Sequence, residues 1–169
     1  ALLEDAMAAV ADCDTVVAVV GGSSSRFGVQ GEFDANGAMK EQTAVTMDCG
    51  ENVDCASLAL PGDQLALLGR LKAAGKRVVT VLIGGRPYEM GEIDRCSDAI
   101  LCCFYPGPTG GEAIAKLLFG FCEPAGRLCV SLPDETGQLP VYYNAKDSYR
   151  SMAYYNASRP RYGFGCGLS

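Results

Sequence analysis

The chain contains no histidine. This absence excludes a Ser-His-Asp triad, a Cys-His pair, any imidazole base and a mixed Cys/His zinc site. Nine cysteines are present, but no Cys-x-x-Cys spacing occurs among them, so a cysteine-only metal site has no support. We therefore expect no metal and no cofactor. Any acid/base chemistry must come from carboxylates, lysine, tyrosine or cysteine.

The chain also lacks a run of Lys or Arg and a long apolar run. Its net charge is −6, and an anionic surface repels phosphate backbones, so nucleic acid is not an expected partner. No apolar stretch reaches the roughly 18 residues of a membrane span, and no signal peptide is recognisable at the start. With 169 residues, the chain is long enough for one domain with its own core.

We expect the cysteines to be reduced and to act as small buried hydrophobes, because Cys102, Cys103 and Cys129 lie inside apolar runs. Reduced cysteines favour a reducing compartment, so we expect a cytoplasmic location. The chain begins at Ala1 within a helical pattern and without an initiator Met. We therefore expect an upstream part to be missing, and secretion of the whole protein stays open.

Short apolar runs rich in β-branched residues predict strands that are buried on both faces. Each run ends at glycine or proline. The predicted strands are Thr15–Val20, Arg77–Ile83, Ala99–Tyr105 and Arg127–Leu132.

Helical spacing of apolar residues predicts helices between these strands. The predicted helices are residues 2–11, 63–74, a short segment within 89–97, and one that opens with a capping box at Thr109 and Glu112 and turns Phe121 inward. Such alternation predicts an α/β three-layer sandwich: one domain over residues 1–169, with a mostly parallel sheet of about six strands and helices on both faces. Residues 134–169 carry six of the eight tyrosines and lack periodicity, which indicates a tail that wraps the sheet and could add an edge strand.

A long connection separates Val20 from Pro61, and it shows no convincing helix or strand. Loops of this length are usually functional or disordered. This one leaves the carboxyl end of a strand, where open α/β sheets bind ligands. It also carries six acids against two basic residues: Glu32, Asp34, Glu41, Asp48, Glu51 and Asp54 against Arg26 and Lys40.

Two parts of this connection leave alternatives open. Residues 21–28 could cradle an anion, hydrogen-bond a hydroxyl-rich ligand or form a structural turn, but they match no nucleotide-binding fingerprint. Each acid could be a solvated surface group. Glu51 stands out because Gly50 allows an unusual backbone angle beside it and a fixed turn at Pro61-Gly62 follows.

Four segments, taken in order, carry a resemblance to a known family. They are GENVDCASLALPGDQ at 50–64, YPGPTGGEAIAKLLFG at 105–120, PAGRL at 124–128 with QLP at 138–140, and YGFGCGLS at 162–169. These segments resemble the E-G-x-D-R-x-x-L-x-L-P-G-x-Q, Y-P-G-x-x-G-G-x-A-I-A-x-x-L-F-G, P-S-G-R-L and Y-P-F-G-Y-G-L-S segments of glycoside hydrolase family 3. The part of that family concerned is its C-terminal α/β-sandwich domain.

The resemblance implies that Glu51 is the general acid/base of a retaining exo-acting β-glycosidase, with Glu41 in reserve and Asp54 supporting the turn. It implies sugar contacts from Ser25 and Arg26. Cys55 stands where the family has an arginine, so the charge that would brace Asp54 is missing.

The partners implied by the resemblance are an oligosaccharide or aryl glycoside with a terminal β-D-glucosyl or β-D-xylosyl residue and a preceding barrel domain that supplies the nucleophile. This chain alone is then expected to be inactive, and a homodimer stays open. Two alternatives remain: a non-catalytic sugar-binding or regulatory module of the same descent, and an unrelated nucleotide-binding α/β domain.

Overall fold

The computed structural model describes residues 2–24, 35–37, 47–50, 53–144 and 159–168. Three parallel strands form its sheet in the order β1 (Thr15–Gly21), β2 (Arg77–Ile83) and β3 (Ala99–Phe104). The α/β class, the parallel sheet and these three predicted strands are confirmed. Within the described residues the sheet has fewer strands than we expected.

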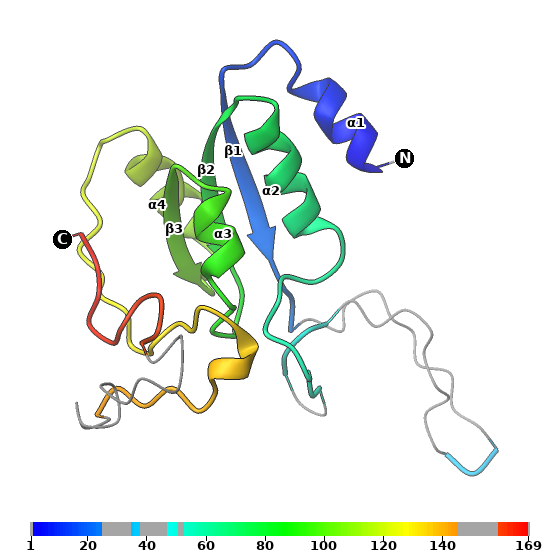
Figure 1. Ribbon diagram of the computed structural model, residues 1–169, viewed down its shortest axis with the longest axis vertical. Helices are drawn as coiled ribbons and strands as arrows, with labels where there is room; N and C mark the ends of the chain where they lie inside the picture. The colour runs from blue at the N-terminus through cyan, green and yellow to red at the C-terminus, as the bar shows by residue number, and fades with distance from the viewer. Residues whose placement is uncertain (1, 25–34, 38–46, 51–52, 145–158, 169) are drawn as a thin grey trace.

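The helices alternate with the strands as predicted. They are α1 (Leu2–Ala9), α2 (Gln64–Ala73), α3 (Gly91–Arg95) and α4 (Gly110–Leu118), followed by a 3-10 turn at Thr136–Gln138. Figure 1 shows α2 and α3 in front of the sheet and α4 behind it, so helices lie on both faces. No helix among the described residues has both the length and the apolar composition that crossing a membrane requires.

The main core lies between the sheet and the pair α2 and α3. Leu68 and Leu71 of α2 pack there with Val78 and Leu82 of β2, and all four side chains are buried. Burying a leucine or valine side chain contributes about 1.5–3 kcal/mol relative to leaving it in water. On the other face of β1, Val17 and Val19 are 47% and 64% exposed, so the prediction of burial on both faces is wrong for this strand in the described structure.

The predicted strand at Arg127–Leu132 does not form. Only Leu132 is bridged, antiparallel to Tyr162 of the tail, with hydrogen bonds of 2.8 and 3.2 Å between their backbones. The Leu128 N–H donates to the carbonyl of Cys166 at 2.9 Å. The segment therefore pairs with the returning tail rather than with the sheet.

Three side-chain predictions are also wrong. Thr109 precedes α4 as expected, but its side chain makes no capping hydrogen bond, and Phe121 is exposed instead of inward. The cysteines are all free thiols, as expected, but none of them is buried. Five are exposed: Cys13, Cys55, Cys122, Cys129 and Cys166.

All three strands end at one edge of the sheet, at the lower end of the arrows in Figure 1. Gly21 ends β1 with φ of 138°, and a Cβ there would lie 1.7 Å from the carbonyl oxygen of Ile83, so only glycine fits. The Gly22 N–H donates to that same carbonyl at 3.0 Å, and the Gly84 N–H donates to the carbonyl of Phe104 at 3.1 Å. The loops that leave the three strands therefore start side by side.

Candidate functional site

The long connection after β1 returns to the carboxyl edge of the sheet, as the sequence predicts. Its described parts before α2 form turns and bends, with no helix or strand. The Asp48 N–H donates to the carbonyl of Ser23 at 3.0 Å, so the returning chain lies beside the segment that left β1. Residues 48–50 are thereby fixed at the edge where open α/β sheets bind ligands.

Asp48 is the buried acid of this edge. It is 7% exposed, and its Oδ2 accepts a hydrogen bond from the hydroxyl of Tyr88, which is 1% exposed. Burial raises the pKa of Tyr88 strongly, and the hydrogen bond to Asp48 raises it further. Tyr88 is therefore a neutral donor to this carboxylate.

Arg86 braces the loop on both sides of Gly50. Its Nε donates to the carbonyl of Asp48, and its terminal nitrogen donates to the carbonyl of Val53 at 2.8 Å. The Val53 N–H donates to the carbonyl of Gly50 at 3.3 Å. Arg86 therefore holds the backbone of this part of the loop, and the Cys55 thiol adds a contact to the Asp48 carbonyl at 3.2 Å.

The end of β3 supplies a tyrosine to the same place. The Tyr105 hydroxyl lies 2.8 Å from the Cys49 thiol. Burial and then the contact with Cys49 raise the pKa of Tyr105, against an opposing hydrogen bond with Ser24. A register shift next to Ile83 and a φ of 50° at Phe104 turn the chain just before Tyr105.

The far end of the connection is held by polar side chains. The Leu58 N–H donates to Thr136 Oγ1 at 2.8 Å, and that hydroxyl donates to Glu89 Oε2 at 2.6 Å. The Glu89 N–H in turn donates to the carbonyl of Leu58 at 2.9 Å. The returning chain is therefore tied to the sheet edge on both sides of Glu51 in the sequence.

Four predicted site residues, Glu51, Glu41, Ser25 and Arg26, lie outside the described residues. Asp54 is described and exposed, and the bracing of this part of the loop comes from Arg86 instead. The sequence reasoning missed Asp48, Arg86 and Tyr88 as a group. Asp48 was one of several acids with no distinguishing signal, and the only signal for the other two was their place directly after a strand-ending Gly84-Gly85.

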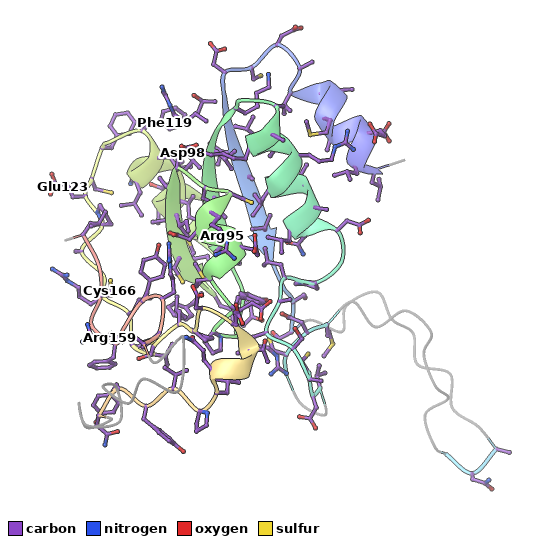
Figure 2. All side chains as sticks on the ribbon, viewed as in Figure 1. Arg95, Asp98, Phe119, Glu123, Arg159 and Cys166 are labelled. Carbon is purple, nitrogen blue, oxygen red and sulfur yellow. The ribbon has the colours of Figure 1, made fainter. Side chains whose placement is uncertain are left out.

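A hollow of about 440 Å³ lies elsewhere, at the amino ends of the strands. Figure 2 labels Asp98 at this upper end of the molecule, away from the loop cluster. Asp98 pairs with Lys72 at 2.7 Å and also accepts from the Val78 N–H at 2.8 Å, which lowers the pKa of its carboxyl. Because Asp98 is already paired with Lys72 and with the Val78 N–H, we take the carboxyl edge of the sheet, and not this hollow, as the candidate site. Within the described residues, no three His, Cys, Asp or Glu side chains gather as a metal site would require.

Comparison with known proteins gives the family. The sequence matches the glycosyl hydrolase family 3 C-terminal domain over residues 1–169. The chain therefore belongs to glycoside hydrolase family 3, as its C-terminal domain. The resemblance inferred from the four sequence segments is confirmed.

Relatives and solved structures agree with this assignment. A periplasmic β-glucosidase of Salmonella typhimurium is 34% identical over all of this chain, and a β-xylosidase of Formosa agariphila is 35% identical over 85% of it. A crystal structure of a β-glucosidase from Listeria innocua in complex with gluconolactone aligns with 99% of the chain at TM-score 0.74 and 30% identity. A β-glucosidase structure from Erythrobacter marinus aligns with 99% of the chain at TM-score 0.76 and 36% identity.

The chain spans only about a fifth of the length of these relatives: 21% of the Salmonella and Formosa proteins, 22% of the Listeria one and 20% of the Erythrobacter one. Each relative therefore contains a large further part that has no counterpart in this chain.

Proposed function

We propose that this chain is the domain that supplies the general acid/base, Glu51, to a retaining exo-acting β-glycosidase. The substrates would be oligosaccharides or aryl glycosides with a terminal β-D-glucosyl or β-D-xylosyl residue. The observation that carries the proposal is the family membership over the whole chain, with relatives named as β-glucosidase and β-xylosidase. These names favour hydrolysis over a non-catalytic sugar-binding role.

The chemistry needs two carboxyl groups. In retaining hydrolysis they lie about 5–5.5 Å apart: one attacks the sugar, and the other protonates the leaving oxygen and then deprotonates water. The absence of histidine leaves carboxylates as natural proton carriers. Glu51 directly follows Gly50, whose carbonyl accepts from the Val53 N–H, and Arg86 holds the carbonyl of Val53, so the described residues on both sides of Glu51 in the sequence are held at the carboxyl edge.

The nucleophile would come from a barrel domain that is not part of this chain. Support comes from the relatives, which are about five times longer than the chain. Hydrolysis then takes place between two domains, and residues 1–169 by themselves should not hydrolyse glycosides. Ser25 and Arg26 follow directly on Ser24, which hydrogen-bonds Tyr105 at the same edge, and this supports a role for them in contacting sugar hydroxyls.

The test is Glu51→Ala in the full-length parent enzyme. Loss of a general acid lowers rates by about 10²–10⁴-fold where the leaving group needs protonation. Hydrolysis of phenyl glycosides should therefore fall much further than hydrolysis of dinitrophenyl glycosides, and added azide should restore turnover on the activated substrate. Both glucosides and xylosides should be measured, since the sugar pocket lies largely outside this chain.

Glu41→Ala is the matched control, because Glu41 is a second acid of the same connection. It should leave the ratio of the two rates unchanged. If Glu41→Ala shows the selective loss and azide rescue instead, the role passes to Glu41. An equal loss on both substrates in Glu51→Ala, without rescue, would sink the assignment.

We also propose that the parent enzyme works in a reducing compartment, the bacterial cytoplasm. Nine free thiols support this, five of them exposed. One relative is named as periplasmic, so the location needs a direct measurement. Fractionation of the source cells decides it, and glycosidase activity recovered in the periplasm or medium would contradict the proposal.

A further inference from the structure

Asp48 is an unusual residue for a domain core. Within the described residues it is the only buried Asp, Glu, Lys or Arg. Its Oδ2 accepts from Tyr88, but its Oδ1 is buried and has no hydrogen-bond partner in the described structure. An unsatisfied buried carboxylate oxygen is costly, so this residue does not stabilise the fold in the way an apolar side chain would.

The surroundings of Asp48 are shaped to hold it. A Cβ added at Gly22 would lie 2.1 Å from the carboxyl carbon and both carboxyl oxygens, so the carboxylate rests directly on the bare backbone of Gly22. A Cβ added at Gly84 would come 2.5 Å from the Tyr88 hydroxyl oxygen. The first residue after β1 and the first after β2 must therefore both be small for the Asp48–Tyr88 pair to form.

The main chain of Asp48 is held as firmly as its side chain. Its N–H donates to the Ser23 carbonyl at 3.0 Å, and its carbonyl accepts from Arg86 Nε and from the Cys55 thiol. The backbone and the carboxylate of this one residue thus contact segments that follow β1 and β2. Glu51 lies only three positions further along the chain.

We propose that Asp48 is the positioning residue for Glu51. It locks the returning chain onto the strand ends, through Tyr88 and Gly22 on its side chain and through Ser23 and Arg86 on its main chain. The role does not require contact with the sugar. This inference rests on the proposed function of Glu51 and names the residue on which that function would depend for its geometry.

The physical reason is the sensitivity of proton transfer to distance. A displacement of about 1 Å at a reacting group can lower a rate about 10²-fold. Substrates with poor leaving groups depend on protonation, whereas activated ones do not. Loss of the Asp48 anchor should therefore change the ratio of the two rates, which a general loss of stability would not do.

The test uses Asp48→Asn and Tyr88→Phe in the full-length parent enzyme. Each should lower kcat on phenyl glycosides by about 10²-fold while kcat on dinitrophenyl glycosides stays within about threefold, with little change in KM. The double variant should be little worse than either single one, because both act on the same contact: Asp48→Asn removes the charge of the acceptor, and Tyr88→Phe removes the donor. Tyr88→Phe keeps the buried ring, so it decides the matter if Asp48→Asn fails to fold.

Asp94→Asn is the matched control. Asp94 also accepts a hydrogen bond from a tyrosine hydroxyl, that of Tyr162, but it lies on α3 and holds the tail. This variant should lower Tm and leave the ratio of rates unchanged. The proposal is overturned if Asp48→Asn or a folded Tyr88→Phe behaves like Asp94→Asn. A failure of Glu51→Ala to show azide rescue is a separate result and would overturn the proposed function itself.

Discussion

Gln64, the first residue of α2, holds Gly21, the last residue of β1, through two hydrogen bonds. The Gly21 N–H donates to Gln64 Oε1 at 2.6 Å, and Gln64 Nε2 donates to the Gly21 carbonyl at 2.8 Å. The same Nε2 also donates to the carbonyl of Pro61 at 3.0 Å. One side-chain amide therefore joins the end of β1, where the long connection starts, to Pro61, where the connection ends. Its two bonds to Gly21 take the place of the backbone hydrogen bonds that a further strand would make.

Gln64→Ala should loosen this junction. It leaves part-buried backbone groups without partners, which costs about 1–3 kcal/mol. Hydrogen exchange of the parent enzyme should show faster exchange in β1 and at the start of α2. Lys116→Ala is the control, since its exposed ion pair with Glu112 is worth under about 1 kcal/mol. Unchanged protection of β1 in Gln64→Ala would contradict the role of the amide.

Gly22→Ala should disturb the carboxyl edge through Asp48, whose carboxyl atoms are the nearest that a Cβ at this position would meet. The φ of Gly22 does not lie in the left-handed region, so alanine is acceptable to the backbone and the clash at 2.1 Å is with the carboxylate. We expect a loss of Tm in Gly22→Ala and partial recovery in the double variant Gly22→Ala/Asp48→Ala, which is a coupling measured by a double-mutant cycle. Gly111→Ala, where a Cβ meets no atom within 4 Å, should be neutral or slightly stabilising. Equal effects at the two glycines would argue against the clash.

Tyr88 should give the protein a pH-dependent stability. Its pKa is raised in the folded state, chiefly by burial and then by Asp48, so the fold prefers the protonated hydroxyl. An unfolded tyrosine titrates near about pH 10. The contribution of Tyr88 to the free energy of unfolding is therefore fully present below about pH 10. It is lost as the pH rises above that value, because the unfolded chain then binds fewer protons than the folded chain.

The measurement is Tm of the parent enzyme between about pH 9 and pH 11, around the tyrosine titration. Tyr88→Phe has no hydroxyl to deprotonate, so its Tm should decline less with rising pH than that of the wild type. Tyr142→Phe, at an exposed tyrosine, should decline as the wild type does. The interpretation fails if all three proteins lose Tm in parallel.

The sheet could be predicted because its strands are short apolar runs that end at or near glycine or proline. Arg77–Ile83 is such a run, and β2 occupies those residues, with neighbours on both sides. Arg127–Leu132 has a similar composition, yet in the described structure it pairs with no strand of the sheet. Its bridge joins Leu132 to Tyr162 of the tail instead, and composition carries no information on a contact so distant in sequence.

The location of the candidate site could be predicted from the sequence, but the side-chain contacts within it could not. A long acidic connection that leaves the end of β1 indicates the carboxyl edge, and family resemblance selects Glu51 within it. The burial of Asp48 could not be predicted, because it depends on Gly22 and Tyr88, which lie far from it in sequence. Arg86 likewise acts on backbone carbonyls, which any residue provides, so no sequence pattern marks its partners.

Arg86→Lys should weaken the brace while keeping the positive charge. The guanidinium donates to the carbonyls of Asp48 and Val53 through different nitrogens, and a single ammonium cannot reach both with the same geometry. Because Gly50 and Glu51 lie between those two carbonyls in the chain, we expect a loss of about tenfold or more in kcat on phenyl glycosides and little loss on dinitrophenyl glycosides. Stopped-flow or steady-state assays of the parent enzyme provide both rates.

Arg70→Lys is the control for Arg86→Lys. Arg70 donates to Glu4 at 2.5 Å on the surface between α1 and α2, away from the carboxyl edge, and its replacement should leave both rates unchanged. A selective loss in Arg86→Lys alone means that the backbone brace positions the acid. If the two variants behave alike, the charge of Arg86 is sufficient and its two-point contact has no role in the reaction.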